Sequence, residues 1–533
     1  MFSIDQNCHP LWDVVPKLHA LAAAGHHPTH FVEDVDMAFS AIGAKPGQAP
    51  RLAPERFHGS GGADWGAAVF YSEFLGRQPV DLRDWEPYTG MKTAALARLL
   101  GRSVDDLYDA FSPSDNWQLI GPSYVARADH HRLVGDLTVA ETAPFLREMM
   151  DRGRADMRRA FPAAESQRRL DEWFSAENAA LEEMLARRAS GRLVEVYRDW
   201  LERCVGVSAR VELTSSLFAC GADADRTALL ELFTRDYAAA ATLYNDAIAE
   251  TAAKLRPLDT ARGELPFFAV LDRDGHAVRT AVFLAEGDLR IGEDAFSLGR
   301  GGALPIADLV AAGVTCLAGK AVLLVIQVRL RPAGAPLALP YRGSLYMSTA
   351  ERLADKLTAA GLLTAELHPV VRVRFGLLDR LAEIDAPVCL PDYLAASFAK
   401  AELPARDIAA SWRQVVARAT ERLASLRSEP GRQTFWRETC PGELDEIAAL
   451  DARRRELARQ SAPPAELIRP ISRRIADLRK DLTDRLLRQI SVDYQTSEVD
   501  YWDSRGAVMP WCIALGGEQF YHRVVAGAQI YSQ

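Results

Sequence analysis

The chain has 533 residues, enough for two or three domains of ordinary size. Hydrophobic residues make up 48% of it and charged residues 25%, which excludes a disordered, collagen-like or disulfide-scaffold protein. With 63 Lys and Arg against 72 Asp and Glu the net charge is -9, so the composition does not indicate a nucleic-acid-binding protein.

The cysteines and the N-terminus indicate a reduced, cytoplasmic protein. The seven cysteines are scattered, odd in number and never arranged as C-x-x-C, unlike a disulfide framework or a structural zinc site. Residues 1–5 lack the basic and apolar regions of a signal peptide. The longest apolar run of a strand-like segment, 321–326, is far shorter than the ~20 residues that span a bilayer, so we expect no contact with a membrane.

The first part of the chain predicts one helix and one strand, followed by a mostly helical region. Apolar residues recur at helical spacing from Leu11 to Leu21, Gly25 provides a C-cap, and residues 29–32 are typical of a buried strand. Further helices are expected over 93–100, 104–111, 139–150, 165–203 and 224–255.

Strand patterns return after residue 260. Residues 267–271 and 278–284 flank an Asp-Arg-Asp-Gly turn and predict a hairpin, with a third strand over 289–291. A helix over 305–312 then precedes expected strands over 321–329, over 337–339 and near Val370, and a helix over 348–360. Ser348 and Glu351 have the spacing of a capping box. Strands alternating with helices indicate an α/β layer.

The C-terminal part carries a heptad pattern typical of a coiled coil. Ile468, Ile471, Ile475, Leu478 and Leu482 step by three and four residues, and the pattern continues loosely to Ile490. Pro463 and Pro464 interrupt it, which favours two antiparallel helices. Between 451 and 490 there are 11 Lys and Arg and 6 Asp and Glu, which we interpret as a solvated basic face and not as a nucleic-acid site.

These patterns define an α/β protein with helical insertions and a C-terminal antiparallel coiled coil. Its expected parts are a first section of the α/β core (1–90), a mostly helical connecting region (91–260), a second section of the core with the hairpin (261–405), the coiled coil (406–495) and a C-terminal segment that docks on the core (496–533). The docking residues would be the aromatic side chains of Tyr501, Trp502, Trp511, Phe520 and Tyr521.

The densest polar cluster, residues 26–36, contains three histidines and three acids. Glu33, Asp34 and Asp36 follow the predicted strand 29–32, where open α/β sheets bind ligands. The cluster could hold a metal ion, an amine or a ribose hydroxyl. The alternative is a polar loop that merely follows a strand.

Three other loops are weaker candidates. His9 precedes the first helix, whose N-terminal N–H groups could receive an anion, although a helix begun by proline explains the pattern equally. The loop of His58, Gly59, Ser60, Gly61 and Gly62 could cradle a phosphate, but it lacks the lysine of a P-loop. The turn of Ser114, Asp115, Asn116 and Trp117 could bind a ligand or cap a helix.

The segment from Tyr341 to Tyr346 is the best single candidate loop, because it lies between a predicted strand and a predicted helix. Arg342 offers bidentate recognition of an anion, and Gly343 permits close approach of a backbone.

The order of these elements resembles the cysteine-adding enzyme (cysteine ligase) family of bacillithiol biosynthesis. Four features carry the resemblance over most of the chain: the acidic run Phe31 to Asp36, the helix around Leu243 to Asn245 before the strand-rich block, the turn with Tyr341, Gly343 and Tyr346, and the late coiled coil. The sequence departs from the family where Val35 replaces a histidine of the acidic run. The glycine-rich segment before the first helix is reduced to residues 7–10, and the Gly-Gly-Pro turn is incomplete.

The resemblance implies a Rossmann-like nucleotide-binding core, use of ATP or ADP with Mg²⁺, and a homodimer formed through the coiled coil. The leading hypothesis is a ligase-like enzyme that forms a C–N bond between an amino acid, such as cysteine, and a small amine or carboxylate. Glu33, Asp34 and Asp36 would hold the amine or a metal, Arg342 an anionic group, and His9 would act as general base or phosphate contact.

Two alternatives remain open. The first is a non-catalytic interaction protein with a degenerate core, favoured by the loss of the histidine at Val35. The second is a metal-dependent hydrolase that uses His26, His30 and the acids.

Overall fold

The structure is a computed structural model with a mixed α/β architecture, in which 62% of the described residues are helical. It describes residues 1–4, 11–35, 69–72, 82–104, 106–107, 117–119, 133–251, 255–342, 346–500 and 508–533.

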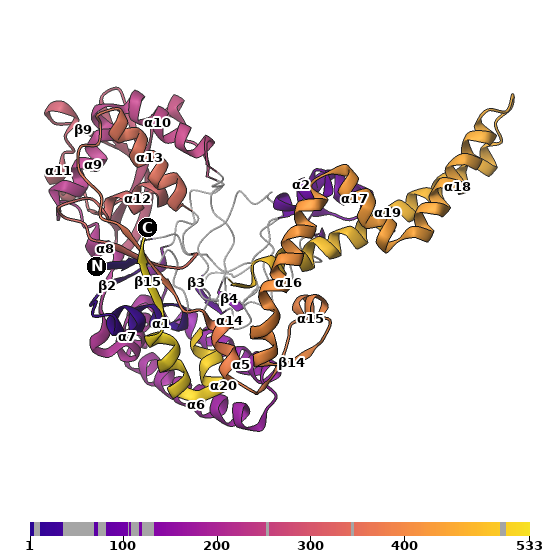
Figure 1. Cartoon of the computed structure of the whole chain (residues 1–533). Helices are drawn as coiled ribbons and strands as arrows, with labels where there is room; N and C mark the ends of the chain where they lie inside the picture. The colour runs from indigo at the N-terminus through magenta and orange to yellow at the C-terminus, as the bar shows by residue number, and fades with distance from the viewer. Residues whose placement is uncertain are drawn as a thin grey trace.

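A six-stranded sheet forms the centre of the molecule (Figure 1). Its strands are β1 (Phe2–Ile4), β2 (Thr29–Val32), β5 (Arg210–Leu213), β11 (Leu337–Pro340), β12 (Val370–Arg374) and β15 (Gln529–Ser532). In space the order is β15-β12-β11-β1-β2-β5, and all pairs are parallel except β12 with β15. The expected strands 29–32 and 337–339 and the strand near Val370 are therefore confirmed as β2, β11 and β12. In the sheet β11 lies next to β12, and β1 separates β11 from β2.

Alternate residues of the sheet enter two different hydrophobic cores. Leu337 and Leu339 of β11 belong to one core, whereas Ala338 between them belongs to the other. The sheet is thus covered on both faces, which parallel sheets require because their crossover helices lie on the faces.

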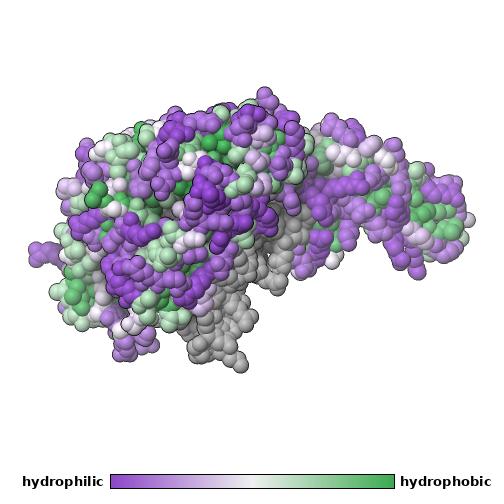
Figure 2. Space-filling view, turned by 90° about the horizontal axis from the view of Figure 1, so that it is seen from below, coloured by the Kyte–Doolittle hydropathy of each residue, from purple (hydrophilic) through white to green (hydrophobic). Residues whose placement is uncertain are grey.

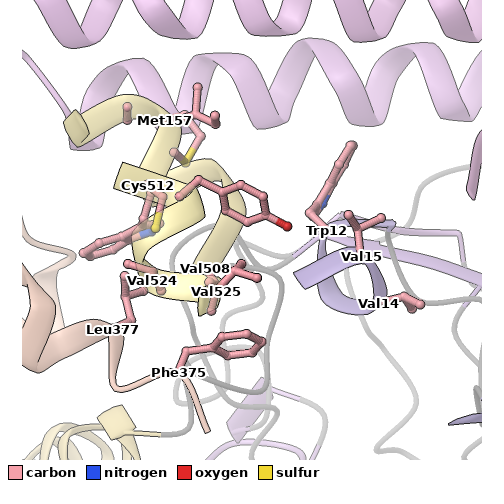
Figure 3. Packing of buried hydrophobic residues seen from close by; sticks show 14 of the residues in the cluster. Trp12, Val14, Val15, Met157, Phe375, Leu377, Val508, Cys512, Val524 and Val525 are labelled. Atoms are coloured by element: carbon pink, nitrogen blue, oxygen red, sulfur yellow. The ribbon is translucent and has the colours of Figure 1, made fainter. Parts of the chain in front are cut away.

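One face of the sheet is covered by helices from both ends of the chain. These are α1 (Leu11–Ala23), α5 (Val139–Ala160), α6 (Ala164–Arg187), α7 (Leu193–Val205) and α20 (Val508–Ala526). Figure 3 shows the side chains between them, including Trp12 and Val15 of α1 and Cys512 and Val525 of α20. The described C-terminal aromatics Trp511, Phe520 and Tyr521 are all buried in this core, whereas Tyr501 and Trp502 lie outside the described residues.

The other face is covered by helices and by a second sheet. The helices are α9 (Ala224–Arg235), α10 (Tyr237–Ala249), α11 (Ile306–Ala311), α12 (Ala321–Gln327) and α13 (Met347–Ala359). The second sheet is antiparallel in the order β10-β6-β7-β8-β9, with β6 (Glu264–Arg273), β7 (His276–Ala285), β8 (Asp288–Ile291), β9 (Asp294–Ser297) and β10 (Val314–Gly319). The predicted hairpin is confirmed: Asp274 and Gly275 both have positive φ between β6 and β7, as two-residue hairpin loops require.

Two local predictions are wrong. Residues 321–327 form helix α12 and not a strand, because a short, wholly apolar run fits a buried helix as well as a buried strand. The side chain of Gln327 accepts a hydrogen bond from the backbone N–H of Gly319 and so ties this helix to β10. The capping box of Ser348 and Glu351 is absent, since α13 begins one residue earlier, after Tyr346.

The predicted helical segments 165–203 and 224–255 are each divided into two helices, at residues 188–192 and at Asp236. Smaller elements complete the described part of the core: β3 (Val69–Ser72), η2 (Leu82–Trp85), α2 (Glu86–Thr89), α3 (Thr93–Leu100), β4 (Trp117–Leu119), η4 (Val134–Asp136), η5 (Gly206–Ser208), α8 (Thr214–Leu217), η6 (Thr260–Arg262), η7 (Arg300–Gly302), α14 (Leu377–Arg380), η8 (Leu381–Glu383), β13 (Pro387–Cys389) and β14 (Glu402–Pro404).

The C-terminal helices form a projecting arm (Figure 1). They are α15 (Asp392–Phe398), α16 (Ala405–Leu426), α17 (Glu429–Thr439), α18 (Pro441–Ala458) and α19 (Ala465–Ser497). Helices α18 and α19 pack side by side and reverse direction around Pro463 and Pro464, as the sequence predicts. No described helix combines the length and the apolar composition needed to cross a membrane.

We expect Trp511→Ala to lower the free energy of unfolding by about 3–5 kcal/mol, because the substitution leaves a large cavity between α20 and α6. Urea denaturation followed by circular dichroism measures the change. Val207→Ala is the control, since the Val207 side chain is 97% exposed. A loss no larger than that of the control would contradict the packing of α20 described above.

Candidate functional site

The candidate site is the edge of the central sheet at which its five parallel strands end, called here the carboxyl edge. Strand β1 is followed in the chain by β2 and β5, which are added on one side of it. The later strands β11 and β12 are added on its other side, so the direction in which the sheet grows reverses between β1 and β11. Open parallel sheets bind ligands at the carboxyl edge next to such a reversal. Two of the predicted candidate segments begin at this edge in the described structure: Glu33 and Asp34 directly follow β2, and Tyr341 and Arg342 directly follow β11. A third candidate, His9, follows β1 in the sequence.

Glu33 and Asp34 are both buried directly after β2. Oε1 of Glu33 accepts a hydrogen bond of 2.8 Å from the backbone N–H of Val35. The Asp34 carboxylate accepts two from Ser215, one of 2.8 Å from the backbone N–H and one of 2.5 Å from the hydroxyl. Ser215 follows β5, so the two neighbouring strands β2 and β5 fix the orientation of Asp34 together.

Burial raises the pKa of Asp34, and the hydrogen bonds from Ser215 oppose this shift without cancelling it. Cys316, in β10 of the second sheet, lies close to the same acids. Burial raises the pKa of its thiol, and the negative charges of Asp34 and Glu33 raise it further. The second sheet therefore meets the carboxyl edge beside these two carboxyl groups.

A third buried acid, Asp136, joins the same region to the hairpin of the second sheet. The backbone N–H of the preceding Gly135 donates to the carbonyl oxygen of Asp34 at 2.9 Å. A side chain at Gly135 would have its Cβ 2.9 Å from that oxygen, which explains the glycine. The Asp136 carboxylate contacts Nη1 of Arg192 at 3.1 Å and Nδ1 of His276 at 3.5 Å.

Arg342 follows β11 and already binds two carboxylates of the chain itself. Its Nη1 lies 2.8 Å from Oε2 of Glu498 and 2.8 Å from Oδ1 of Asp500, both just after α19. Burial lowers the pKa of Arg342, but the two carboxylates outweigh burial and raise it overall. An anionic ligand at Arg342 would therefore have to compete with Glu498 and Asp500. Next to it, the Tyr341 ring lies under the guanidinium of Arg374, 4.5 Å from the ring centroid.

The remaining predicted site residues are only partly described. His9, Asp36, His58, Gly59, Ser60, Gly61, Gly62, Ser114, Asp115, Asn116 and Gly343 lie outside the described residues. Trp117 begins β4, and Tyr346 is the N-cap of α13 with no capping bond from its side chain.

The histidines of the polar cluster do not accompany its acids. His26 precedes β2, whereas Glu33 follows it, so the four residues of the strand, about 13 Å of chain, separate them. His30 is buried within β2, and its Nδ1 lies 2.9 Å from the hydroxyl of Ser3. This arrangement does not favour a metal site shared by His26, His30 and the acids. Within the described residues, no group of three or more His, Cys, Asp or Glu side chains could hold a metal ion.

The sequence patterns did not indicate several residues of the site, among them Ser215, Glu498 and Asp500. Ser215 belongs to a Thr-Ser-Ser run directly after the Val-Glu-Leu of β5, and such a polar run after a short apolar one is a usable signal. Nothing local in the sequence relates Glu498 and Asp500 to Arg342, more than 150 residues earlier.

No family model matches the chain, and neither the curated proteins nor the solved structures contain a significant match to it.

We expect Asp34→Asn to shift the slope of the free energy of unfolding against pH in the positive direction in the acidic range. Because the pKa of Asp34 is higher in the folded protein than its unfolded value of about 3.9, the folded state holds more protons between the two values. The free energy of unfolding contributed by Asp34 therefore falls as the pH rises through that interval, and asparagine lacks this contribution. Urea denaturation from pH 3.5 to 7 measures the slope.

Asp171→Asn is the matched control, since hydrogen bonds from Arg158 and Arg154 hold the pKa of Asp171 below its ordinary value. Its removal should change the slope in the opposite direction. If both substitutions change the slope in the same direction, the environment assigned to Asp34 is wrong.

Proposed function

We propose that the protein is a ligase-like enzyme that forms a C–N bond between an amino acid and a small amine or carboxylate, on a Rossmann-like nucleotide-binding core. The observation that carries the proposal is the carboxyl edge: two polar segments singled out in the sequence, after β2 and after β11, begin at the same edge, on both sides of the reversal between β1 and β11. That is the position at which this class of sheet binds nucleotides and activated substrates.

In this proposal acidic residues bind the cationic group of one substrate, and an arginine binds the anionic group of the other. Glu33 and Asp34, with Asp36 after them, hold the acceptor amine, and Arg342 binds a carboxylate or phosphate after exchange with Glu498 and Asp500. His9 takes the proton that the amine nitrogen loses as it bonds to the activated carbonyl carbon and the leaving group departs. Positioning and charge stabilisation supply most of the rate in such a reaction.

The residues fit a nucleotide better than they fit a directly bound Mg²⁺. Helix α1 begins at Leu11, after the loop that leaves β1 beside the reversal, and the N–H groups of a first helical turn favour phosphate. ATP bound there would supply the phosphoryl or adenylyl group that converts a carboxylate oxygen into a leaving group, with ADP or pyrophosphate released, and the loop of residues 58–62 would be a further phosphate contact. Each carboxylate oxygen of Asp34, by contrast, already accepts one hydrogen bond from Ser215, and the one lone pair left on each oxygen suits a contact with the acceptor amine better than coordination of a metal ion.

The rival proposal, a non-catalytic interaction protein, rests on Val35. This residue stands where the resembled family has a histidine, and its side chain is buried in the same hydrophobic core as Phe31 and Leu133. A position of the acidic run that the family uses for a polar group here contributes to packing. Ligand binding at the carboxyl edge separates the two proposals.

We expect at least one of ATP, ADP with Mg²⁺, the amino acids and amino sugars to raise the midpoint of thermal unfolding. A ligand at about 100 times its dissociation constant stabilises the fold by about 2.7 kcal/mol. Asp34→Ala and Arg342→Ala should each weaken that ligand tenfold or more, because each removes a charged contact. Arg168→Ala is the matched control, since Arg168 is likewise bound to two carboxylates, Glu165 and Glu172, on the surface of α6. Full affinity in both site variants would refute the site assignment, and a flat screen would favour the rival.

We further propose that two copies of the chain associate through the arm. Leu444 and Ile447 of α18 and Ile468 and Ile471 of α19 are only partly buried, and Leu467, close to the turn between the two helices, is 52% exposed. Figure 2 shows hydrophobic residues among hydrophilic ones on the surface of the arm. A pair of helices leaves such a seam open, and a second pair would complete a four-helix bundle.

Leu467→Asp together with Ile468→Asp should convert the expected dimer into a 58.7 kDa monomer, because the charges would be buried without partners. Sedimentation velocity measures the mass. Arg473→Asp, at an exposed position of the same helix, is the charge-changing control and should leave the dimer intact. A wild-type protein that sediments as a monomer at micromolar concentration would exclude the proposed dimer.

A further inference from the structure

A groove of about 460 Å³ lies between α15, α16 and α19, and none of its lining residues belongs to the carboxyl edge. Its volume falls in the range of ~300–1,000 Å³ that is usual for small-molecule sites. The two long walls repeat at helical spacing, with Val415, Arg418, Ala419 and Arg422 on α16 and Arg485, Arg488, Gln489 and Val492 on α19. Ala396 and Ser397 of α15 complete the lining.

Among the ten described residues that line the groove, four are arginines and none is acidic, in a chain whose net charge is -9. Arginines one turn apart on the same helix repel each other, and here two such pairs face one another across the groove. Part of this charge is balanced from outside the lining. The fully buried Asp493 binds Arg422 through two bonds of 2.6 and 2.7 Å, and Asp484 binds Arg488.

These carboxylates orient the arginines but leave many of their donors unused. Arg422 uses Nε and Nη2 for Asp493, and Arg488 uses only Nε, for Asp484. Both Nη groups of Arg488 and the Nη1 group of Arg422 have no partner in the described part of the chain. A guanidinium carries five N–H donors in a fixed fork, so these groups can bind phosphate oxygens without breaking the existing pairs.

Arg418 and Arg485 extend the same surface. Arg485 is held by Glu443 at 2.8 Å and by the thiol of Cys440 at 3.2 Å. Arg418 is exposed and makes no hydrogen bond or ion pair with any described residue. Arg418 therefore has no partner among the described residues, and it lies beside three arginines whose orientation is fixed by groups outside the lining. This is the arrangement of a preformed anion site.

We propose that this groove binds a small aliphatic metabolite that carries two phosphate groups, such as a sugar bisphosphate. Two facing arginine pairs match two separate phosphates, because each pair lies on its own helix. None of the described lining residues is aromatic, so they offer no surface on which a nucleobase could stack, whereas Val415 and Val492 suit an aliphatic backbone. Oε1 of Gln489 can accept from a hydroxyl, since its Nε2 group donates to Asp493.

Isothermal titration calorimetry with fructose 1,6-bisphosphate, pyrophosphate, inorganic phosphate and ADP tests the proposal on the full-length protein. We expect saturable binding of the bisphosphate, tighter than inorganic phosphate and ADP. Arg418→Ala and Arg488→Ala should each weaken it about tenfold or more, and raising the salt concentration should weaken it further. Arg418→Lys should restore only part of the affinity, because lysine keeps the charge and loses the fork.

Arg413→Ala is the matched control, since Arg413 lies on the same helix, α16, and pairs with Asp379 outside the groove. It should leave the affinity unchanged, and circular dichroism should show all variants folded. The proposal is overturned if no phosphate compound binds saturably. It is also overturned if ADP binds more tightly than the bisphosphate in a manner sensitive to Arg418, or if both groove variants keep the full affinity.

Discussion

Parallel strands oblige a chain to return to the same edge of the sheet before each new strand can start. In this protein five strands obey that constraint, and every segment that leaves a strand therefore emerges at the carboxyl edge. Residues as distant as Asp34 and Arg342 are brought to one border of the sheet by topology alone, before any contact between side chains is considered. The long connections needed for the returns hold most of the remaining structure, since the whole second sheet lies within the crossover from β5 to β11.

The same constraint determines how the surroundings of the edge are built. A sheet covered on both faces can be reached by ligands only at its borders, and here the border is met by the second sheet through Cys316 and the hairpin residue His276. It is met from another direction by the segment after α19, through Glu498 and Asp500. Two separate parts of the chain thus meet the carboxyl edge, and each supplies charged or ionisable groups to it.

The sequence predicted correctly those helices and strands that a local pattern determines. It did not predict contacts that depend on residues far apart in the chain. The hairpin of β6 and β7 could be predicted because an Asp-Gly pair favours a two-residue turn. Helix α19 could be predicted because its apolar residues recur on one helical face. The strand expected over 321–329 is a helix because six consecutive apolar residues have no periodicity to distinguish the two. For the site, the acids after β2 were found from their position after a strand, but the partners of Arg342 could not be, since no pattern relates residues so far apart. The proposed ligase activity and coiled-coil dimer stay predictions.

Helix α19 has 33 residues and is therefore about 50 Å long. One end lies at the tip of the arm, its C-terminal half forms a wall of the arginine groove, and the two acids that hold Arg342 follow its other end. Packed helices shift as rigid bodies, so a change in the packing of this helix against α15, α16 and α18 would change all three places together. A tilt of about 5° over such a length would displace one end by about 4 Å relative to the other, more than enough to separate an ion pair. Because the arm, the groove and the edge of the sheet share this one helix, a ligand that changed its tilt at one of them would change the geometry at the other two.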